Sequence, residues 1–81
     1  MATVYILKSL NFDITYTGST TDLIRRLKEH NNGECCYTRK YSPWRLMYRE
    51  DFIDLSAARK RERYFKSCAG RKFIKKNLFS Q

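Results

Sequence analysis

The stretch 3–19, TVYILKSLNFDITYTGS, decides the fold. Residues 3–8 and 14–19 are rich in β-branched and aromatic side chains, which favour strands. Only five residues separate the two segments. The stretch therefore predicts an antiparallel hairpin at the start of the chain.

A turn centred on residues 10–11 would place Lys8 opposite Asp13 and Tyr5 opposite Tyr16. The pairing of opposite charges across the strands favours that register. Any even-length tight loop keeps both tyrosines on one face of the sheet, because side chains alternate between faces along a strand.

A helix is expected over residues 21–31, because hydroxyl and carboxylate side chains suited to an N-cap precede it and Gly33 follows it. Its apolar sector is formed by three aliphatic side chains, Leu23, Ile24 and Leu27. Arg26 and His30 lie one turn apart at the border of this sector. Both are therefore expected near the sheet.

Three further elements follow a loop at 34–43. Residues 44–52 alternate between apolar and polar side chains, which predicts a third strand with one buried face. Ser56 is expected to cap a second helix that ends near Cys68, and a last short helix covers residues 71–79. The order β-β-α-β-α-α predicts an α+β fold, a small three-stranded antiparallel sheet flanked by helices.

The second helix carries the basic run Arg59-Lys60-Arg61-Glu62-Arg63. Arg61 projects from the middle of its apolar face and needs an acidic partner, for which Glu50 and Asp51 are the candidates. Glu62 is a single carboxylate at the edge of that face.

The composition fits one small globular domain spanning residues 1–81, with 42% hydrophobic and 15% aromatic residues. Lys and Arg number 17 against 8 Asp and Glu, a net charge of +9, and residues 51–81 contribute +6 of it. This balance excludes an acidic scaffold and indicates a polyanionic partner, nucleic acid before membrane. No apolar run approaches a membrane span and no signal peptide opens the chain, so a cytoplasmic location is expected.

The cysteines fit a reducing compartment, since their number is odd and no C-x-x-C pair is present. A mixed metal site is a minor alternative to ordinary thiols. Its ligands would be His30, Cys35, Cys36 and Cys68.

Five side chains form a candidate catalytic set: Tyr5, Tyr16, Arg26, His30 and Glu62. Each has an ordinary structural alternative, such as core packing for a strand tyrosine or an ion pair with Lys66 for Glu62. Together they provide what phosphodiester hydrolysis requires: a base for water, positive charge at the phosphate and a carboxylate for a divalent metal.

Two tripeptides, Thr3-Val4-Tyr5 and Tyr16-Thr17-Gly18, resemble the signatures of the GIY-YIG endonuclease superfamily. In that family an arginine lies ten residues after the second signature tyrosine and a His or Tyr fourteen after it, where this chain has Arg26 and His30. Glu62 matches the family's metal-binding Glu. The chain is similar to small stand-alone bacterial members and to the N-terminal domain of an excision-repair nuclease. It departs in having Thr3 for the first signature glycine.

The resemblance implies hydrolysis of DNA with one Mg²⁺ or Mn²⁺ ion held by Glu62. In that interpretation Tyr5 is the general base, His30 or Tyr16 orients it or the water, and Arg26 holds the phosphate. Tyr16 remains the alternative base. Many members also have a late Asn in the site, for which Asn77 is the candidate.

The basic residues of the C-terminal third are expected to bind the DNA backbone: Lys60, Arg63, Lys66, Arg71, Lys72, Lys75 and Lys76. The sequence therefore predicts a structure-directed or weakly specific DNA endonuclease of repair or recombination. A protein partner that supplies specificity is possible, and the state is a monomer or a homodimer. Two alternatives stay open: a non-catalytic nucleic-acid-binding module, and an interaction domain of a repair complex.

Overall fold

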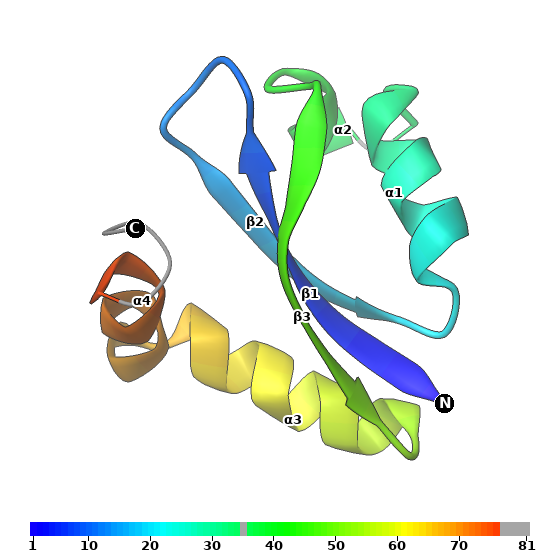
Figure 1. Cartoon of the computed structure of the whole chain (residues 1–81), viewed down its shortest axis with the longest axis vertical. Helices are drawn as coiled ribbons and strands as arrows, with labels where there is room; N and C mark the ends of the chain where they lie inside the picture. The colour runs from blue at the N-terminus through cyan, green and yellow to red at the C-terminus, as the bar shows by residue number, and fades with distance from the viewer. Residues whose placement is uncertain (35, 77–81) are drawn as a thin grey trace.

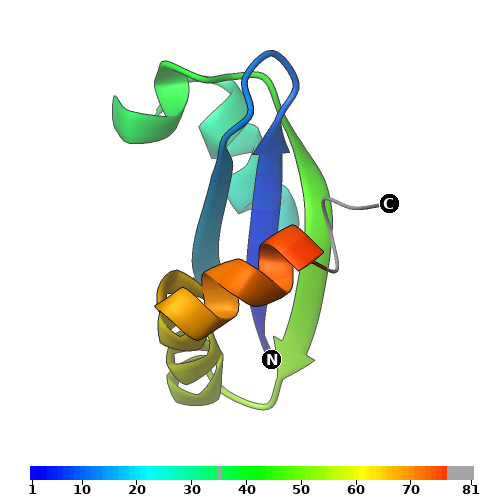
Figure 2. The ribbon, with the colours of Figure 1, turned by 90° about the vertical axis from the view of Figure 1, so that its left-hand side faces the viewer.

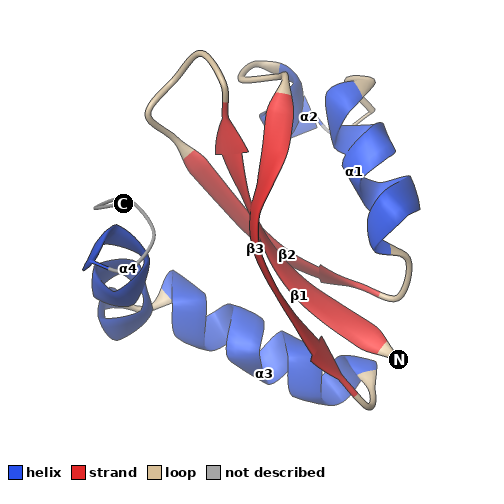
Figure 3. Ribbon diagram, in the orientation of Figure 1, coloured by secondary structure: helices blue, strands red, loops and turns tan. Residues whose placement is uncertain are grey.

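A three-stranded antiparallel sheet with the order β2-β1-β3 lies between two pairs of helices in a computed structural model that describes residues 1–34 and 36–76. Helices α1 and α2 cover one face, and α3 and α4 cover the other (Figures 1 and 3). The elements, in chain order, are β1 (Ala2–Ser9), β2 (Thr15–Thr20), α1 (Leu23–Asn31), α2 (Cys36–Arg39), β3 (Trp44–Phe52), α3 (Leu55–Lys66) and α4 (Cys68–Ile74). The predicted α+β class and three-stranded antiparallel sheet are confirmed.

The β1–β2 hairpin forms as predicted, but its register differs by two residues. Lys8 pairs with Thr15 and Tyr5 with Gly18, so Tyr5 and Tyr16 are diagonal neighbours on one face. The expected pair with Asp13 is wrong because the Lys8 ammonium instead donates to carbonyl oxygens of the turn itself. The shared face, which the even-length loop preserves, is confirmed.

Both faces of the sheet are buried, each by its own cluster. On the α3–α4 face, Val4, Ile6, Phe65 and Ile74 form a core, and α4 lies across the strands there (Figure 2). On the α1 face the core is formed by Tyr5, Leu7 and Trp44. Alternate residues of β1 therefore serve opposite faces, and β1 is buried along almost its whole length.

Strand β3 changes face part-way along. A bulge at Met47 shifts the pairing, so that Leu46 lies opposite Leu7 while Tyr48 lies opposite Ile6. Leu46 then packs on the α1 side and Tyr48 on the α3 side. The predicted single buried face is wrong, because the extra residue reverses the alternation.

Helix α1 begins two residues later than predicted, after Asp22, whose carboxylate accepts a hydrogen bond from the backbone N–H of Arg25. Leu23 and Leu27 pack against the sheet as expected. Ile24 does not, since 73% of its surface is exposed.

The second predicted helix is divided at Ser67. Asp54, rather than Ser56, caps the N-terminus of α3, and Ser67 caps α4, which therefore starts earlier than predicted and includes Gly70. The predicted partner of Arg61 is confirmed as Glu50, at 2.8 Å. The last three residues expected in the final helix, 77–79, lie outside the described residues.

The expected loop at 34–43 contains the short helix α2, which buries Thr38 completely. No helix in the described part of the chain has the length and apolar composition needed to span a membrane.

Candidate active site

A buried hydrogen-bonded chain runs from β1 through α1 to α2. The Tyr5 hydroxyl lies 3.1 Å from Nε2 of His30, and Nδ1 of His30 lies 2.8 Å from Oγ1 of Thr38. All three side chains are at most 1% exposed. Both ring nitrogens of His30 are therefore occupied, which fixes the orientation of the imidazole.

Tyr16 lies over this chain on the same face. Its ring centroid is 4.8 Å from that of His30 and 6.4 Å from that of Tyr5, with the two phenol rings nearly parallel. Trp44 of β3 also contacts Tyr16, with 6.4 Å between their ring centroids. Tyr16 is only half-buried, unlike Tyr5, so it is the more accessible phenol of the pair.

Gly18 allows the phenol of Tyr5 to lie flat against β2. A Cβ at this position would lie 2.5 Å from the Tyr5 hydroxyl oxygen and 2.8 Å from its Cζ. Such contacts are too short for any side chain. The signature glycine is therefore required by the close approach of Tyr5.

Burial raises the pKa of Tyr5 to about 12, and the charge of Glu62 acts in the same direction. A hydrogen bond from Arg26 and its positive charge oppose this rise. Arg26 also forms an ion pair with Glu29 at 2.9 Å. Burial, followed by the charge of Arg26, lowers the pKa of His30 to about 4. The imidazole is therefore neutral at physiological pH.

Glu62 reaches the site from the opposite face of the sheet. Its carboxylate accepts a hydrogen bond from the Ser19 hydroxyl at 2.6 Å and one from the Lys66 ammonium at 2.8 Å. Burial raises the pKa of Glu62, but the hydrogen bonds from Lys66 and Ser19 and the charge of Arg59 outweigh it, and its pKa lies below the usual range. The carboxylate is therefore ionised at neutral pH and 21% exposed.

Four residues of the predicted catalytic set thus form one group: Tyr5, Tyr16 and His30 through ring contacts and a hydrogen bond, and Arg26 through its hydrogen bond to Tyr5. Glu62 binds Ser19 on the other face of the sheet and is linked to the group through the effect of its charge on the pKa of Tyr5. Sequence reasoning missed Ser19, Thr38 and Arg59. Arg59 is one turn from Glu62, a spacing from which it was predictable. Asn77 lies outside the described residues.

The GIY-YIG catalytic domain family matches residues 1–76 of the chain. The chain belongs to the GIY-YIG family. A UPF0213 protein of Haloquadratum walsbyi is 46% identical over 65 residues, covering 79% of this chain and 72% of the relative. A UPF0213 protein of Clostridium perfringens is 45% identical over 64 residues, covering 78% and 68%.

Among solved structures, the solution NMR structure of a UPF0213 protein from Bacillus halodurans is similar, with a TM-score of 0.55 and 38% identity. The match covers 99% of this chain and 84% of that one. The resemblance drawn from the tripeptides is therefore confirmed, and the chain is a small member of the GIY-YIG nuclease superfamily.

The predicted DNA-binding residues of this GIY-YIG domain fall into different places. Arg63 lines a cavity of about 540 Å³ together with Ser56, Arg59 and Glu62. The side chains that line hollows between β2 and the α3–α4 pair are Lys66, Arg71 and Lys75. The others, Lys60, Lys72 and Lys76, are exposed outside these cavities.

Within residues 1–34 and 36–76, no group of three or more His, Cys, Asp or Glu side chains is placed to hold a metal ion. His30 has no free ring nitrogen, which argues against the mixed site with cysteines. Glu62 offers oxygen donors of the kind that Mg²⁺ and Mn²⁺ prefer, and its ionised, partly exposed carboxylate fits an ion held mainly by water and phosphate.

Proposed function

We propose that the protein is a metal-dependent endonuclease that hydrolyses DNA phosphodiester bonds, structure-directed or weakly sequence-specific, in repair or recombination. The observation that carries this proposal is the grouping of Tyr5, Tyr16, Arg26 and His30 on one face of the sheet, with the charge of the Glu62 carboxylate raising the pKa of Tyr5. A net charge of +9 supports a polyanionic substrate.

In the proposed mechanism Glu62 holds the divalent ion, which when bound supplies charge stabilisation at the phosphate and the leaving 3′-oxygen. The Lys66 ammonium donates a hydrogen bond to this carboxylate and helps to keep it ionised, the form that would hold the ion. Arg26, with 32% of its side chain exposed, holds the phosphate. Its charge also favours the ionised form of Tyr5.

Tyr5 is the proposed general base, and His30 positions it. Because His30 is neutral, its Nε2 accepts the hydrogen bond of the phenol when Nδ1–H donates to Thr38. The imidazole then orients the phenol oxygen through this hydrogen bond, which is its positioning role. Burial of Tyr5 opposes ionisation, so Arg26 and the bound ion have to offset it.

Tyr16 is the alternative base, and its greater exposure favours that assignment. The two assignments differ in what a single hydroxyl deletion removes. If Tyr5 is the base, Tyr5→Phe abolishes cleavage while DNA binding persists. If Tyr16 is the base, Tyr16→Phe has this effect and Tyr5→Phe retains cleavage.

The test of the function is a cleavage assay on supercoiled plasmid and on branched or flapped DNA with Mg²⁺ or Mn²⁺. Glu62→Gln should abolish metal-dependent cleavage. Glu34→Gln, which changes an exposed residue after the C-terminal end of α1, is the control and should leave cleavage unchanged. Equal cleavage by Glu62→Gln would refute the mechanism. Salt-sensitive binding without cleavage by the native protein would support the non-catalytic binding module instead.

A further inference from the structure

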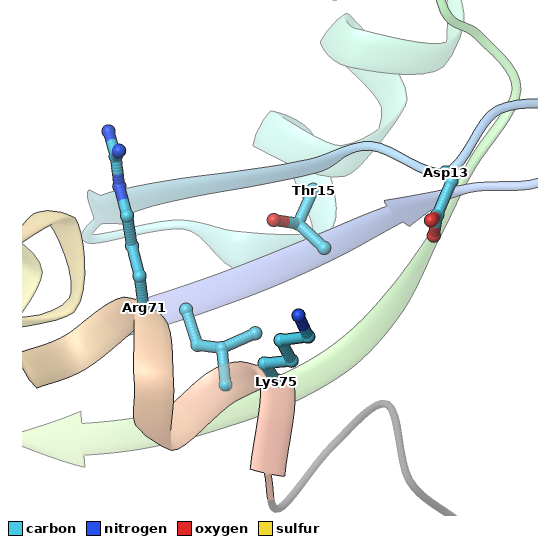
Figure 4. Close-up of a pocket in the computed structure, with 5 residues that line it drawn as sticks. Asp13, Thr15, Arg71 and Lys75 are labelled. Atoms are coloured by element: carbon cyan, nitrogen blue, oxygen red, sulfur yellow. The ribbon is translucent and has the colours of Figure 1, made fainter. Parts of the chain in front are cut away.

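A continuous groove follows the outer edge of β2 on the α3–α4 side of the molecule. Two adjoining cavities of about 300 and 400 Å³ share the walls Thr15, Arg71 and Ile74. In Figure 4, Arg71 of α4 and Lys75, which directly follows α4, extend toward β2, Thr15 faces the helix, and Asp13 lies at one end. We call this hollow the β2 groove.

The β2 groove leads to the candidate metal ligand. Lys66 lines its other end and donates a hydrogen bond to Glu62 at 2.8 Å. Thr17 of β2, which pairs with Ile6 of the core on the α3 side, also lines the groove. A chain molecule in the groove would therefore run along the edge of the sheet toward the candidate metal ligand Glu62.

The walls of the groove match a nucleic-acid strand. Ile74 and Phe65 give it an apolar floor, while Lys66, Arg71 and Lys75 form a basic rim. Among the residues that the structure describes, Arg71 and Lys75 form no ion pair, so their charges are available for phosphates. An acidic peptide would share the charge, but the groove leads to the ionised carboxylate of Glu62, the ligand proposed for a metal ion in phosphodiester hydrolysis, which favours a nucleic-acid strand.

We propose that the β2 groove holds one strand of the nucleic acid next to the scissile phosphate, with Arg71 and Lys75 each contacting a backbone phosphate. This proposal rests on the proposed function, because it takes nucleic acid as the substrate. It also separates Arg71 and Lys75, which line the groove, from Lys60 and Lys72, which lie outside it.

The test compares two double variants that remove the same number of charges. Arg71→Gln with Lys75→Gln alters the groove, and Lys28→Gln with Lys40→Gln, at two exposed residues that line neither cavity, is the matched control. Binding of a labelled single-stranded oligonucleotide is measured in EDTA, which prevents cleavage, over a range of salt concentrations. Losing two phosphate contacts should make the slope of log K against log salt shallower by about 1.4. The gain in affinity between 1 M and 0.1 M salt should therefore be about 25-fold smaller for the groove variant than for the native protein.

The control should keep the slope of the native protein, because it removes no phosphate contact in the groove. Arg71→Lys with Lys75→Arg keeps both charges and should restore the slope, which separates lost contacts from misfolding. Equal slopes for the groove variant and the control would overturn the groove, leaving the proposed function intact. A native protein with no salt-dependent binding would instead refute the proposed function. If the groove variant lost binding to an acidic peptide but kept its binding to the oligonucleotide, the groove would be a peptide site and the proposal would be refuted.

Discussion

Acidification should destabilise the protein through its single histidine, His30. The imidazole is fully buried and both of its nitrogens are hydrogen-bonded, to Tyr5 and Thr38. Burial and the positive charge of Arg26 lower its pKa from 6.5 to about 4, although Glu29 opposes the shift. Protonating His30 therefore costs more free energy in the folded protein than in the unfolded chain.

The sign of the effect follows from which state binds the proton. Between pH 6.5 and 4 the imidazole is protonated in the unfolded chain but neutral in the folded protein. The unfolded state then binds more protons, so the free energy of unfolding falls as the pH falls. From pH 7 to pH 5 the expected loss is about 2 kcal/mol. That is a large share of the stability of so small a domain.

The measurement is urea unfolding at pH 7, 6 and 5, with His30→Gln as the control that lacks the titrating group. Glu62 and Asp51, whose pKa values lie below their usual range, stay ionised between pH 7 and pH 5 and do not contribute to the change. The native protein should lose stability over the window and His30→Gln should not. An equal loss in both proteins would refute the reasoning. A direct NMR titration that gave His30 a pKa of 6.5 or above would refute it as well.

Two substitutions test the surroundings of the Tyr5 phenol. Gly18→Ala should lower the free energy of unfolding, measured in urea, by about 1–3 kcal/mol, because the new methyl group would displace the Tyr5 ring. Unchanged stability would show that the close approach of Tyr5 does not require glycine. Thr38→Val keeps the shape of the side chain but leaves Nδ1 of His30 without a partner, so the free energy of unfolding should fall by about 1–3 kcal/mol. The rate of DNA cleavage should fall as well, while the affinity for DNA stays the same. Full cleavage by this variant would show that Thr38 does not position His30.

The hairpin shows what alternation along a strand predicts and what it leaves open. An even-length loop placed Tyr5 and Tyr16 on one face, and that result does not depend on the exact register. The register itself depends on the turn, where Lys8 binds the carbonyl oxygens of Ser9 and Phe12. Those acceptors exist only once the turn has formed, so residue types alone do not identify them.

The bulge in strand β3 and the helix α2 were missed for a related reason. The bulge at Met47 inserts one residue, and nothing in the alternating pattern marks where the pairing with β1 shifts. Thr38 lies in a segment without apolar periodicity, yet it is fully buried because His30 and Trp44 both bind to it. Tertiary partners, rather than local propensity, place both features.

Gly18 explains how groups from opposite faces of the sheet share one site. Tyr5 belongs to the α1 face, whereas Ser19 and Glu62 meet on the α3 side. Without a Cβ at Gly18, the Tyr5 hydroxyl lies against the backbone of the edge strand, near enough for the charge of Glu62 to raise its pKa. A side chain at this position would displace the phenol. The second signature glycine is therefore the residue that lets the proposed base lie against the edge strand, whose next residue, Ser19, binds the proposed metal ligand.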